Sequence, residues 1–378
     1  MAADMSSTAS PIGVNGSRST TGLPPIVRGG RPIDLNRQPV IVAWEVTRAC
    51  AYRCLHCRAD AQPRPAPGEL NVAEGQALVE DLARFGAGTT LVLTGGDPML
   101  RSDLVDLAAR AHRLGLGVAI TPSATGKVTP PRLAALREAG VKALAISLDG
   151  GNAESHDGMR GVRGSHARSL RILRWAHEAG FALQVNSTIT RHNVHEIPAM
   201  AEQAVAAGAR VWSVFFLVPT GRGNTTDLLD AAGHERALRQ LVLLRAQLPL
   251  HLKTTAAPAV RRVEAQMAEE GLVPSPAPPL PVNDGRGFMF ISHDGKVCPS
   301  GFLPLPAGNV RNASAVDLYR ESPLFVGLRD PARLEGRCGI CRWRDVCGGS
   351  RSRAYALTGN PFAEEPTCSY DPEMDATC

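Results

Sequence analysis

Short apolar runs alternate with longer amphipathic stretches between residues 40 and 218. Six runs rich in β-branched residues have the length of strands, and they lie at residues 40–46, 90–93, 118–121, 143–148, 183–189 and 212–218. The stretches between them carry apolar residues at helical spacing, at residues 72–85, 104–114, 131–139, 166–179 and 197–207. Strict alternation of strand and helix predicts right-handed βαβ units and a parallel sheet. Six strands are too few to close an eight-stranded barrel, so the pattern predicts an α/β fold built as an open, partial (β/α)6 barrel.

The same pattern divides the chain into four segments. Residues 1–38 are rich in Ser, Gly, Thr and Pro and show little apolar periodicity, which predicts a disordered leader. Residues 39–225 form the barrel, and residues 226–282 form a helical connection that ends in a Pro-rich linker at 274–281. Residues 283–378 form a small cysteine-rich domain, which begins with a predicted hairpin at 287–292 and 296–298.

Composition excludes several classes of function. The chain has 44% hydrophobic and 20% charged residues, which is ordinary for a globular protein, and it contains no run of 18 apolar residues that would cross a membrane. A formal net charge of +5 without a basic cluster, together with 4% aromatic residues, gives no platform for nucleic acid. The first forty residues hold no apolar core of a secretory signal, so we expect a cytoplasmic protein. Nine cysteines in such a chain indicate metal binding rather than disulfides.

Three of these cysteines follow the first predicted strand in the pattern Cys50-x₃-Cys54-x₂-Cys57. A loop that closes within eight residues can bring three thiolates to three corners of a [4Fe–4S] cluster and leave the fourth iron open to a ligand. A structural zinc site made by the same cysteines and His56 is the alternative.

The segment Cys50-Ala-Tyr-Arg-Cys54-Leu-His-Cys57 resembles the CxxxCxxC signature of the radical S-adenosylmethionine (SAM) superfamily. The resemblance covers residues 40–370 and implies a partial (β/α)6 barrel in which the open iron chelates the methionine part of SAM. It also implies that Thr94-Gly95-Gly96-Asp97-Pro98, after the second strand, binds the amino group of SAM, although the family usually has Glu in place of Asp97. Ser147 and Asn186, at the ends of the fourth and fifth strands, would bind the ribose and carboxylate of SAM. His56 stands where relatives carry an aromatic residue that packs on the adenine.

A second set of cysteines lies near the carboxyl terminus, as Cys338-x₂-Cys341-x₅-Cys347 followed by Cys368. This spacing resembles the SPASM and twitch extensions of radical SAM enzymes, which hold auxiliary [4Fe–4S] clusters. A full two-cluster pattern has further cysteines where this chain has Ala313 and Arg351. We therefore expect one auxiliary [4Fe–4S] cluster bound by these four cysteines, with structural zinc as the alternative.

Two cysteines are left over. Cys298 occupies the place of the first ligand of the missing cluster, and we expect either an orphan thiol or one that faces the substrate. Cys378 is the last residue, and we expect no role for it.

The resemblance implies an enzyme that cleaves SAM reductively to a 5′-deoxyadenosyl radical, which abstracts hydrogen from an unactivated carbon. Relatives of this layout act on ribosomal peptides during maturation or on tetrapyrrole side chains in haem-type biosynthesis, and the sequence does not choose between these substrates. An electron donor such as flavodoxin or ferredoxin would be a partner. The alternatives are an iron–sulfur redox sensor or scaffold that does not cleave SAM, and a zinc-stabilised hydrolase on a similar barrel.

Overall fold

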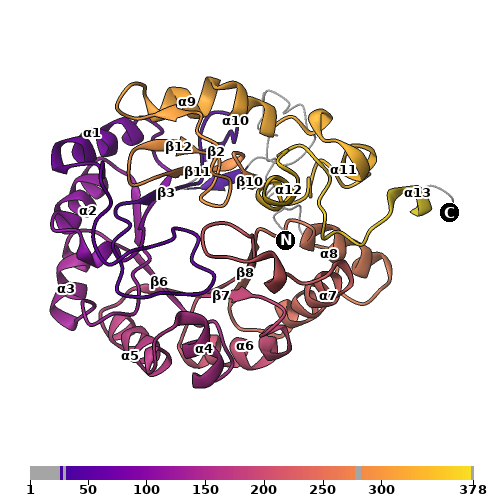
Figure 1. Cartoon of the computed structure of the whole chain (residues 1–378), viewed down its shortest axis with the longest axis horizontal. Helices are drawn as coiled ribbons and strands as arrows, with labels where there is room; N and C mark the ends of the chain where they lie inside the picture. The colour runs from indigo at the N-terminus through magenta and orange to yellow at the C-terminus, as the bar shows by residue number, and fades with distance from the viewer. Residues whose placement is uncertain (1–25, 29–30, 277–281, 376–378) are drawn as a thin grey trace, which may run out of the picture.

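A parallel sheet forms the centre of the protein (Figure 1). The computed structural model describes residues 26–28, 31–276 and 282–375. All six predicted strands are present and pair in parallel with their neighbours in chain order. They are β3 (Ile41–Glu45), β4 (Thr90–Thr94), β5 (Gly117–Ile120), β6 (Ala143–Ser147), β7 (Ala182–Ile189) and β8 (Val211–Phe216). The predicted α/β fold with an open sheet is therefore confirmed.

Helices cover the outer face of this sheet (Figure 1). The five predicted helices are present as α1 (Val72–Ala83), α2 (Leu104–Arg113), α3 (Pro130–Glu138), α5 (Ser165–Glu178) and α6 (Ile197–Ala206). A further helix, α4 (Ala153–Arg160), was not predicted. It buries only His156 and Met159, so it carries no apolar stripe that the sequence could reveal. Its boundaries come instead from Asn152, which caps its start, and from Gly161, whose φ of 66° ends it.

The sheet extends beyond the six predicted strands at β8. Here β9 (His251–Thr255) pairs in parallel with β8, between α7 (Ala231–Gln247) and α8 (Val260–Glu269). The strand was missed because its sequence, HLKTT, is mostly polar and only Leu252 is fully buried. The sheet therefore continues into the segment that the sequence assigned to a helical connection.

The opposite edge of the sheet is extended by the carboxyl-terminal segment. The predicted hairpin is confirmed as β11 (Gly287–Ile291) and β12 (Lys296–Cys298), and β11 also pairs in parallel with β3. The short strands β10 (Asn283–Asp284) and β13 (Gly308–Asn309) flank this hairpin. The rest of the segment lies at one side of the sheet (Figure 1), as α9 (Ala315–Glu321), α10 (Pro323–Leu328), α11 (Gly336–Ile340), α12 (Arg351–Thr358) and α13 (Pro372–Asp375).

Several predictions fall partly or wholly outside the described residues. Residues 1–25 and 29–30 of the predicted leader, residues 277–281 of the Pro-rich linker, and Cys378 lie outside them. The described part of the leader contains a small hairpin of β1 (Ile26–Arg28) and β2 (Arg31–Ile33), and Ile33 and Leu35 are buried against Val40. The division of the chain into four segments stays a prediction. No described helix is both long and apolar enough to span a bilayer.

The two faces of the sheet have different neighbours. On β3, Val42 and Trp44 belong to the main core beneath the helices, whereas Ala43 belongs to a separate cluster with Phe290 and Cys298. Because successive side chains of a strand point to opposite faces, Ala43 and its partners line the inner face of the open barrel. The carboxyl ends of the parallel strands all meet at one edge of this barrel, where active groups gather in such folds.

Candidate active site

The three amino-terminal cysteines lie in one loop directly after β3. Cys50 and Cys54 are buried and Cys57 is partly exposed. Each sulfur has a nearby donor. Tyr52 N lies 3.3 Å from Cys50 Sγ, Arg160 Nη1 lies 3.6 Å from Cys54 Sγ, and Ala61 N lies 3.5 Å from Cys57 Sγ. Donors of this kind stabilise thiolates bound to iron, so the loop fits the three-cysteine cluster site.

Two arginines hold the carbonyl groups of this loop. Arg222, which follows β8, donates from Nε to Cys54 O at 2.9 Å and from Nη1 to Ala61 O at 2.8 Å. Arg48 donates from Nε to Ala59 O at 2.8 Å. Next to Arg222, Gly221 has a φ of 64°, and a Cβ there would lie 2.4 Å from Cys57 O. The cysteine loop is therefore attached to the far side of the barrel as well as to its own strand.

The double glycine after β4 lies directly against the start of the cysteine loop. A Cβ at Gly95 would lie 2.4 Å from Thr47 O, and a Cβ at Gly96 would lie 2.3 Å from Ala49 O. Gly96 N donates to Thr47 O at 2.8 Å, so the two loops share backbone hydrogen bonds. Gly95 also has a φ of 147°, in the region that favours glycine. The predicted GG turn is thus a close backbone contact that only glycine permits.

The Asp97 side chain is fully buried. Its carboxylate accepts hydrogen bonds from Met99 N at 3.1 Å and from Thr125 Oγ1 at 2.7 Å. Burial raises its pKa, while these donors oppose that effect. Its neighbour in space, Ser123, donates to Gly96 O at 2.8 Å and lies 3.3 Å from Cys50 Sγ. The Asp97 side chain therefore fixes the turn, and Ser123 links that turn to the first cysteine.

His56 lies beside a buried carboxylate at the end of β6. Its Nε2 is 3.6 Å from Asp149 Oδ2, and Arg160 Nη2 lies 2.5 Å from the same oxygen. Burial lowers the pKa of His56 to about 4, with Asp149 opposing the effect, so the imidazole is neutral near pH 7. Burial opposes ionisation of Asp149, but Arg160, the two nearby histidines and the Thr188 N–H together hold the pKa of that carboxyl below its ordinary value. Arg160 thus connects this carboxylate to Cys54.

Ser147, the last residue of β6, lies side by side with Asn186 in the middle of β7. They are direct partners in the register of β6 and β7. Gln184 donates from Nε2 to Asn186 Oδ1 at 2.6 Å, which leaves the amide nitrogen of Asn186 to donate elsewhere. Both side chains are partly exposed.

A second buried carboxylate, Glu45, lies on the other side of the cysteine loop. Arg58 Nη2 is 2.9 Å from Glu45 Oε2, and His293 Nδ1 is 2.7 Å from Glu45 Oε1. Burial opposes ionisation, but Arg58 and His293 hold the pKa of Glu45 below its ordinary value. Arg58 also stacks on the Phe290 ring, 4.5 Å from its centroid. This ion pair joins the cysteine loop to the carboxyl-terminal hairpin.

Cys298 lies on the same inner face of the barrel. It is 4% exposed and packs with Ala43 and Phe290. Burial raises the pKa of its thiol to about 12, so the thiol is protonated near pH 7. It does not line the cavity formed by the other carboxyl-terminal cysteines.

The four remaining described cysteines surround one cavity, lined by Cys338, Cys341, Cys347 and Cys368. Backbone N–H groups approach three of the sulfurs at 3.4 Å, from Glu365 to Cys338, from Trp343 to Cys341 and from Gly349 to Cys347. Within the described parts of the chain, no group of three or more His, Cys, Asp or Glu side chains is close enough together to hold a single metal ion. The four thiols are spread around the wall of the cavity.

Arginines offset the charge that thiolates would carry in this cavity. Burial raises the pKa of Cys347 to about 12, and Arg261 opposes this. Burial also raises the pKa of Cys368, and Arg262 opposes it. Arg351, which stands where a two-cluster pattern has cysteine, lies 3.8 Å from Cys338 Sγ through Nη2 and donates to Ala363 O at 2.7 Å. The donors and arginines fit a cluster held by four thiolates.

Sequence reasoning missed three residues that shape this site. Arg222 lies in a Thr220-Gly-Arg-Gly223 segment whose glycines mark a special loop, but nothing in the sequence connects it to the cysteines. Arg160 lies on the unpredicted helix α4. Glu45 is a charged residue within an otherwise apolar strand, and that exception was the one available signal.

Comparison with known proteins agrees with this geometry. Residues 44–204 match the sequence profile of the Radical SAM superfamily. The AdoMet-dependent heme synthase of Nitratidesulfovibrio vulgaris is 40% identical over 89% of this chain and 94% of its own length. The PqqA peptide cyclase of Rhodopseudomonas palustris is 29% identical over 89% of this chain and 88% of its own.

The fold is also that of a solved structure. The structure of Streptococcus suis SuiB bound to S-adenosylmethionine matches with a TM-score of 0.69 and 16% identity, over 88% of this chain and 78% of that one. The predicted enzyme class and the predicted cofactors, an iron–sulfur cluster and SAM, are confirmed through the family. On its cysteine signature, its partial barrel and its similarity to these enzymes, the chain belongs to the radical SAM superfamily.

Proposed function

We propose that this enzyme abstracts hydrogen from a side chain of a haem-type tetrapyrrole. The observation that carries the proposal is the 40% identity to a heme synthase over nearly the whole of both chains. Because the similarity covers 89% of this chain, it extends into the carboxyl-terminal segment. Peptide maturation is the second candidate, supported by the PqqA peptide cyclase at 29% identity. A redox sensor or scaffold has no support, because the similar proteins are named as enzymes.

We assign the SAM-binding cluster to Cys50, Cys54 and Cys57. The chemistry supplied by the bound cluster and SAM is one-electron cleavage of SAM, which provides the radical that removes hydrogen from a substrate carbon. The residues of this chain hold the three thiolates in place, through the donors to each sulfur and through Arg222 on the loop carbonyls. They also keep water from the buried sulfurs of Cys50 and Cys54.

The residues that we propose to form the SAM site are His56, Gly95, Gly96, Asp97, Ser147 and Asn186. The close packing of Gly95 and Gly96 on the cysteine loop supports a role for the backbone of that turn. Because the Asp97 carboxylate is occupied by Met99 and Thr125, we assign it to fixing the turn rather than to direct contact. The neutral imidazole of His56 can pack on an adenine, and the free amide nitrogen of Asn186 can donate to a carboxylate.

We assign one auxiliary [4Fe–4S] cluster to Cys338, Cys341, Cys347 and Cys368. The backbone donors and arginines around their cavity support a set of thiolate ligands. Structural zinc is the competing occupant, because four thiols suit both metals. We further propose a flavodoxin or ferredoxin as the electron donor and the cytoplasm as the location, where thiols stay reduced.

The test uses anaerobically reconstituted enzyme with dithionite, SAM and iron coproporphyrin III, a haem-type tetrapyrrole with four carboxylate side chains. The expected result is 5′-deoxyadenosine release that rises when the porphyrin is added, together with a change in the porphyrin's mass. The control is the variant with Cys50, Cys54 and Cys57 all changed to Ala, which should release none. The tetrapyrrole proposal would be overturned if the porphyrin neither increased the release of 5′-deoxyadenosine nor changed in mass.

A further inference from the structure

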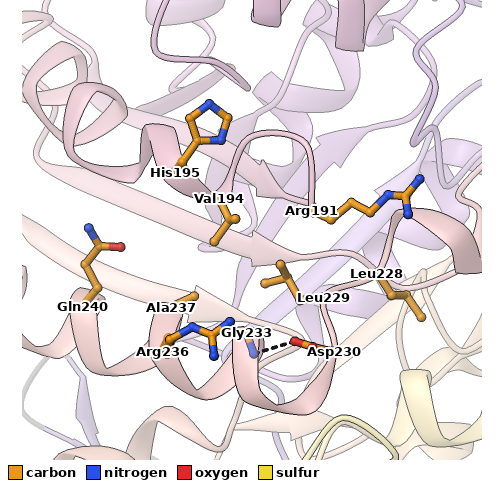
Figure 2. Close-up of a pocket in the computed structure, with 10 residues that line it drawn as sticks. All are labelled: Arg191, Val194, His195, Leu228, Leu229, Asp230, Gly233, Arg236, Ala237 and Gln240. Atoms are coloured by element: carbon orange, nitrogen blue, oxygen red, sulfur yellow. Dashed lines mark hydrogen bonds between the residues drawn. The ribbon is translucent and has the colours of Figure 1, made fainter.

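A cavity separate from both sets of cysteines lies at the rim of the barrel. It has a volume of about 540 Å³, within the range of small-molecule sites. Its walls come from the loop after β7 and from the start of α7, as Figure 2 shows. The lining residues that matter here are Arg191, Val194, His195, Leu229, Arg236 and Ala237.

The apolar side chains of this cavity lie in its middle, and the basic side chains lie at its margin. Figure 2 shows Val194, Leu229 and Ala237 between His195 on one side and Arg236 on the other. Arg191 extends from the loop next to this apolar floor. An apolar surface with cationic groups at its margin fits a ligand that has an apolar body and carboxylates at its edge.

The two arginines are available to such a ligand. Within the described residues, neither Arg191 nor Arg236 forms an ion pair with a carboxylate, and Arg191 makes only a 3.5 Å side-chain contact, to His192. The nearby acids are engaged elsewhere. Asp230 caps Gly233 N at 2.7 Å, and Asp227 lies 2.8 Å from His192.

Glu196 is a further acid close to the cavity, next in the chain to the lining residue His195. It accepts from Gly151 N at 2.6 Å and from Ser155 Oγ at 2.7 Å, and it lies 3.8 Å from His195. These donors hold its carboxylate against the loop after β6. The cavity margin therefore carries two guanidinium groups that no described carboxylate pairs with, alongside the Asp230 carboxylate that caps α7.

The cavity lies close to the cysteine loop. Asn193, next to Val194 in the wall, donates from Nδ2 to Asp149 O at 2.8 Å. Asp149 Oδ2 in turn lies 3.6 Å from His56 Nε2 in the cysteine loop. The loops after β7 and β8 also end at the same edge of the sheet as β3, because these strands are all parallel. The wall of the cavity is thus connected to the cysteine loop through Asn193, Asp149 and His56.

We propose that Arg191 and Arg236 bind carboxylates of the tetrapyrrole substrate and hold its edge at the rim of the barrel. The inference rests on the proposed function and names the site that recognises the part of the substrate away from the reacting carbon. The side chains of Val194 and Leu229 contact the apolar macrocycle. Arg191 and Arg236 supply affinity through charge-assisted hydrogen bonds.

The test measures binding of metal-free coproporphyrin III to the holoenzyme by quenching of porphyrin fluorescence. Changing both Arg191 and Arg236 to Gln should weaken binding by at least about tenfold, because each charged hydrogen bond contributes more than a neutral one. Changing both to Lys should retain most of the affinity, since the charges remain. Arg239→Gln is the matched control on the same helix, where Arg239 pairs with Glu270, and should bind as the unchanged protein does.

The outcomes separate this inference from the proposed function. Equal binding by the double Gln variant and the unchanged enzyme would overturn the assignment of the cavity and leave the tetrapyrrole function standing. Failure of the unchanged enzyme to bind coproporphyrin III would overturn both. Binding of hexaglutamate, but not of the porphyrin, in a way that needs the two arginines would overturn the tetrapyrrole in favour of an acidic peptide. Circular dichroism shows whether each variant is folded, so that a loss of binding reports on the site.

Discussion

Arg222 Nε donates a hydrogen bond to the carbonyl oxygen of Cys54 at 2.9 Å, although the two residues are 168 positions apart in the chain. Cys54 belongs to the loop after β3, and Arg222 follows β8, the last of the six predicted strands. The backbone N–H of Arg222 also donates to Cys57 O at 3.0 Å. The loop that carries the cysteines is therefore tied across the open side of the barrel.

This relationship predicts that Arg222→Ala weakens retention of the cluster without removing a ligand. Loss of the side-chain hydrogen bonds to the carbonyls of Cys54 and Ala61 frees the loop to move. Residues that orient metal ligands typically contribute about 10-fold to 100-fold in affinity, and we expect faster loss of iron on that scale. The measurement is the rate at which the cluster absorbance of reconstituted protein decays with a chelator. Arg64→Ala, at an exposed position just after the same loop, should leave the rate unchanged. Equal rates in the two variants would show that Arg222 does not hold the loop.

The double glycine gives a second prediction. Gly96→Ala would place a Cβ 2.3 Å from the carbonyl oxygen of Ala49, so one of the two loops must shift. Overpacking of this kind costs about 1 to 3 kcal/mol, and here the strain falls on the residue before Cys50. We expect a lower thermal midpoint and less iron bound per chain.

Gly126→Ala is the control for this prediction. Gly126 follows β5, a Cβ added there would meet no atom within 4 Å, and the residue lacks the positive φ of Gly95. We expect that change to leave both the thermal midpoint and the iron content as they are. A Gly96→Ala protein with full iron content and an unchanged midpoint would contradict the account of the turn.

The sequence predicted those parts of the site that depend on local spacing. Cys50, Cys54 and Cys57 lie within eight residues, and the double glycine gains its meaning because it follows this motif by one strand and one helix. The six strands were equally visible because each buries an apolar run. The strand β9 could not be recognised in the sequence, because it is polar apart from Leu252. Its position in the sheet is set by pairing with β8.

Contacts between residues far apart in the chain could not be predicted from the sequence. Arg160 reaches Cys54 from a helix whose boundaries come from its caps rather than from apolar spacing. Glu45 meets His293 across 248 positions, because β11 pairs with β3. Tertiary structure decides such pairs, and no local pattern encodes them.

One experiment can test both predictions about the carboxyl-terminal cysteines, namely that Cys341 binds the auxiliary cluster and that Cys298 does not. Cys341→Ala should cost about four irons per chain, because that residue lines the cavity of the proposed auxiliary cluster. Cys298→Ala should leave the iron content unchanged, since its buried thiol has a pKa of about 12 and lies on the inner face of the barrel. The measurement is iron and zinc per chain after anaerobic reconstitution. Loss of iron in Cys298→Ala, with full iron in Cys368→Ala, would mean that Cys298 replaces Cys368 as a ligand. Zinc in place of four irons would remove the auxiliary cluster.

A buried histidine predicts how stability depends on pH. His234 Nε2 lies 3.4 Å from Arg353 Nη2, and burial together with that arginine lowers the pKa of His234 to about 3. In the unfolded chain the pKa is near the ordinary value of about 6.5. As the pH falls below that value, the unfolded chain binds a proton that the folded protein does not accept until about pH 3. The free energy of unfolding therefore falls across this window, by about 1.4 kcal/mol for each pH unit in the steep part.

His234→Gln should remove this contribution and flatten the acid side of the stability profile. The measurement is the thermal midpoint of the holoenzyme between about pH 7 and pH 5, where the unfolded histidine becomes protonated. The unchanged protein should lose more of its midpoint over that interval than the variant does. His156, whose pKa burial lowers to about 4, contributes in the same direction and remains in both proteins. His112→Gln, at an exposed position, should keep the steeper profile of the unchanged protein. If the thermal midpoints of His234→Gln and His112→Gln fall by the same amount over this interval, the prediction is wrong. His234 would then not be neutral in the folded protein, contrary to what its burial beside Arg353 implies.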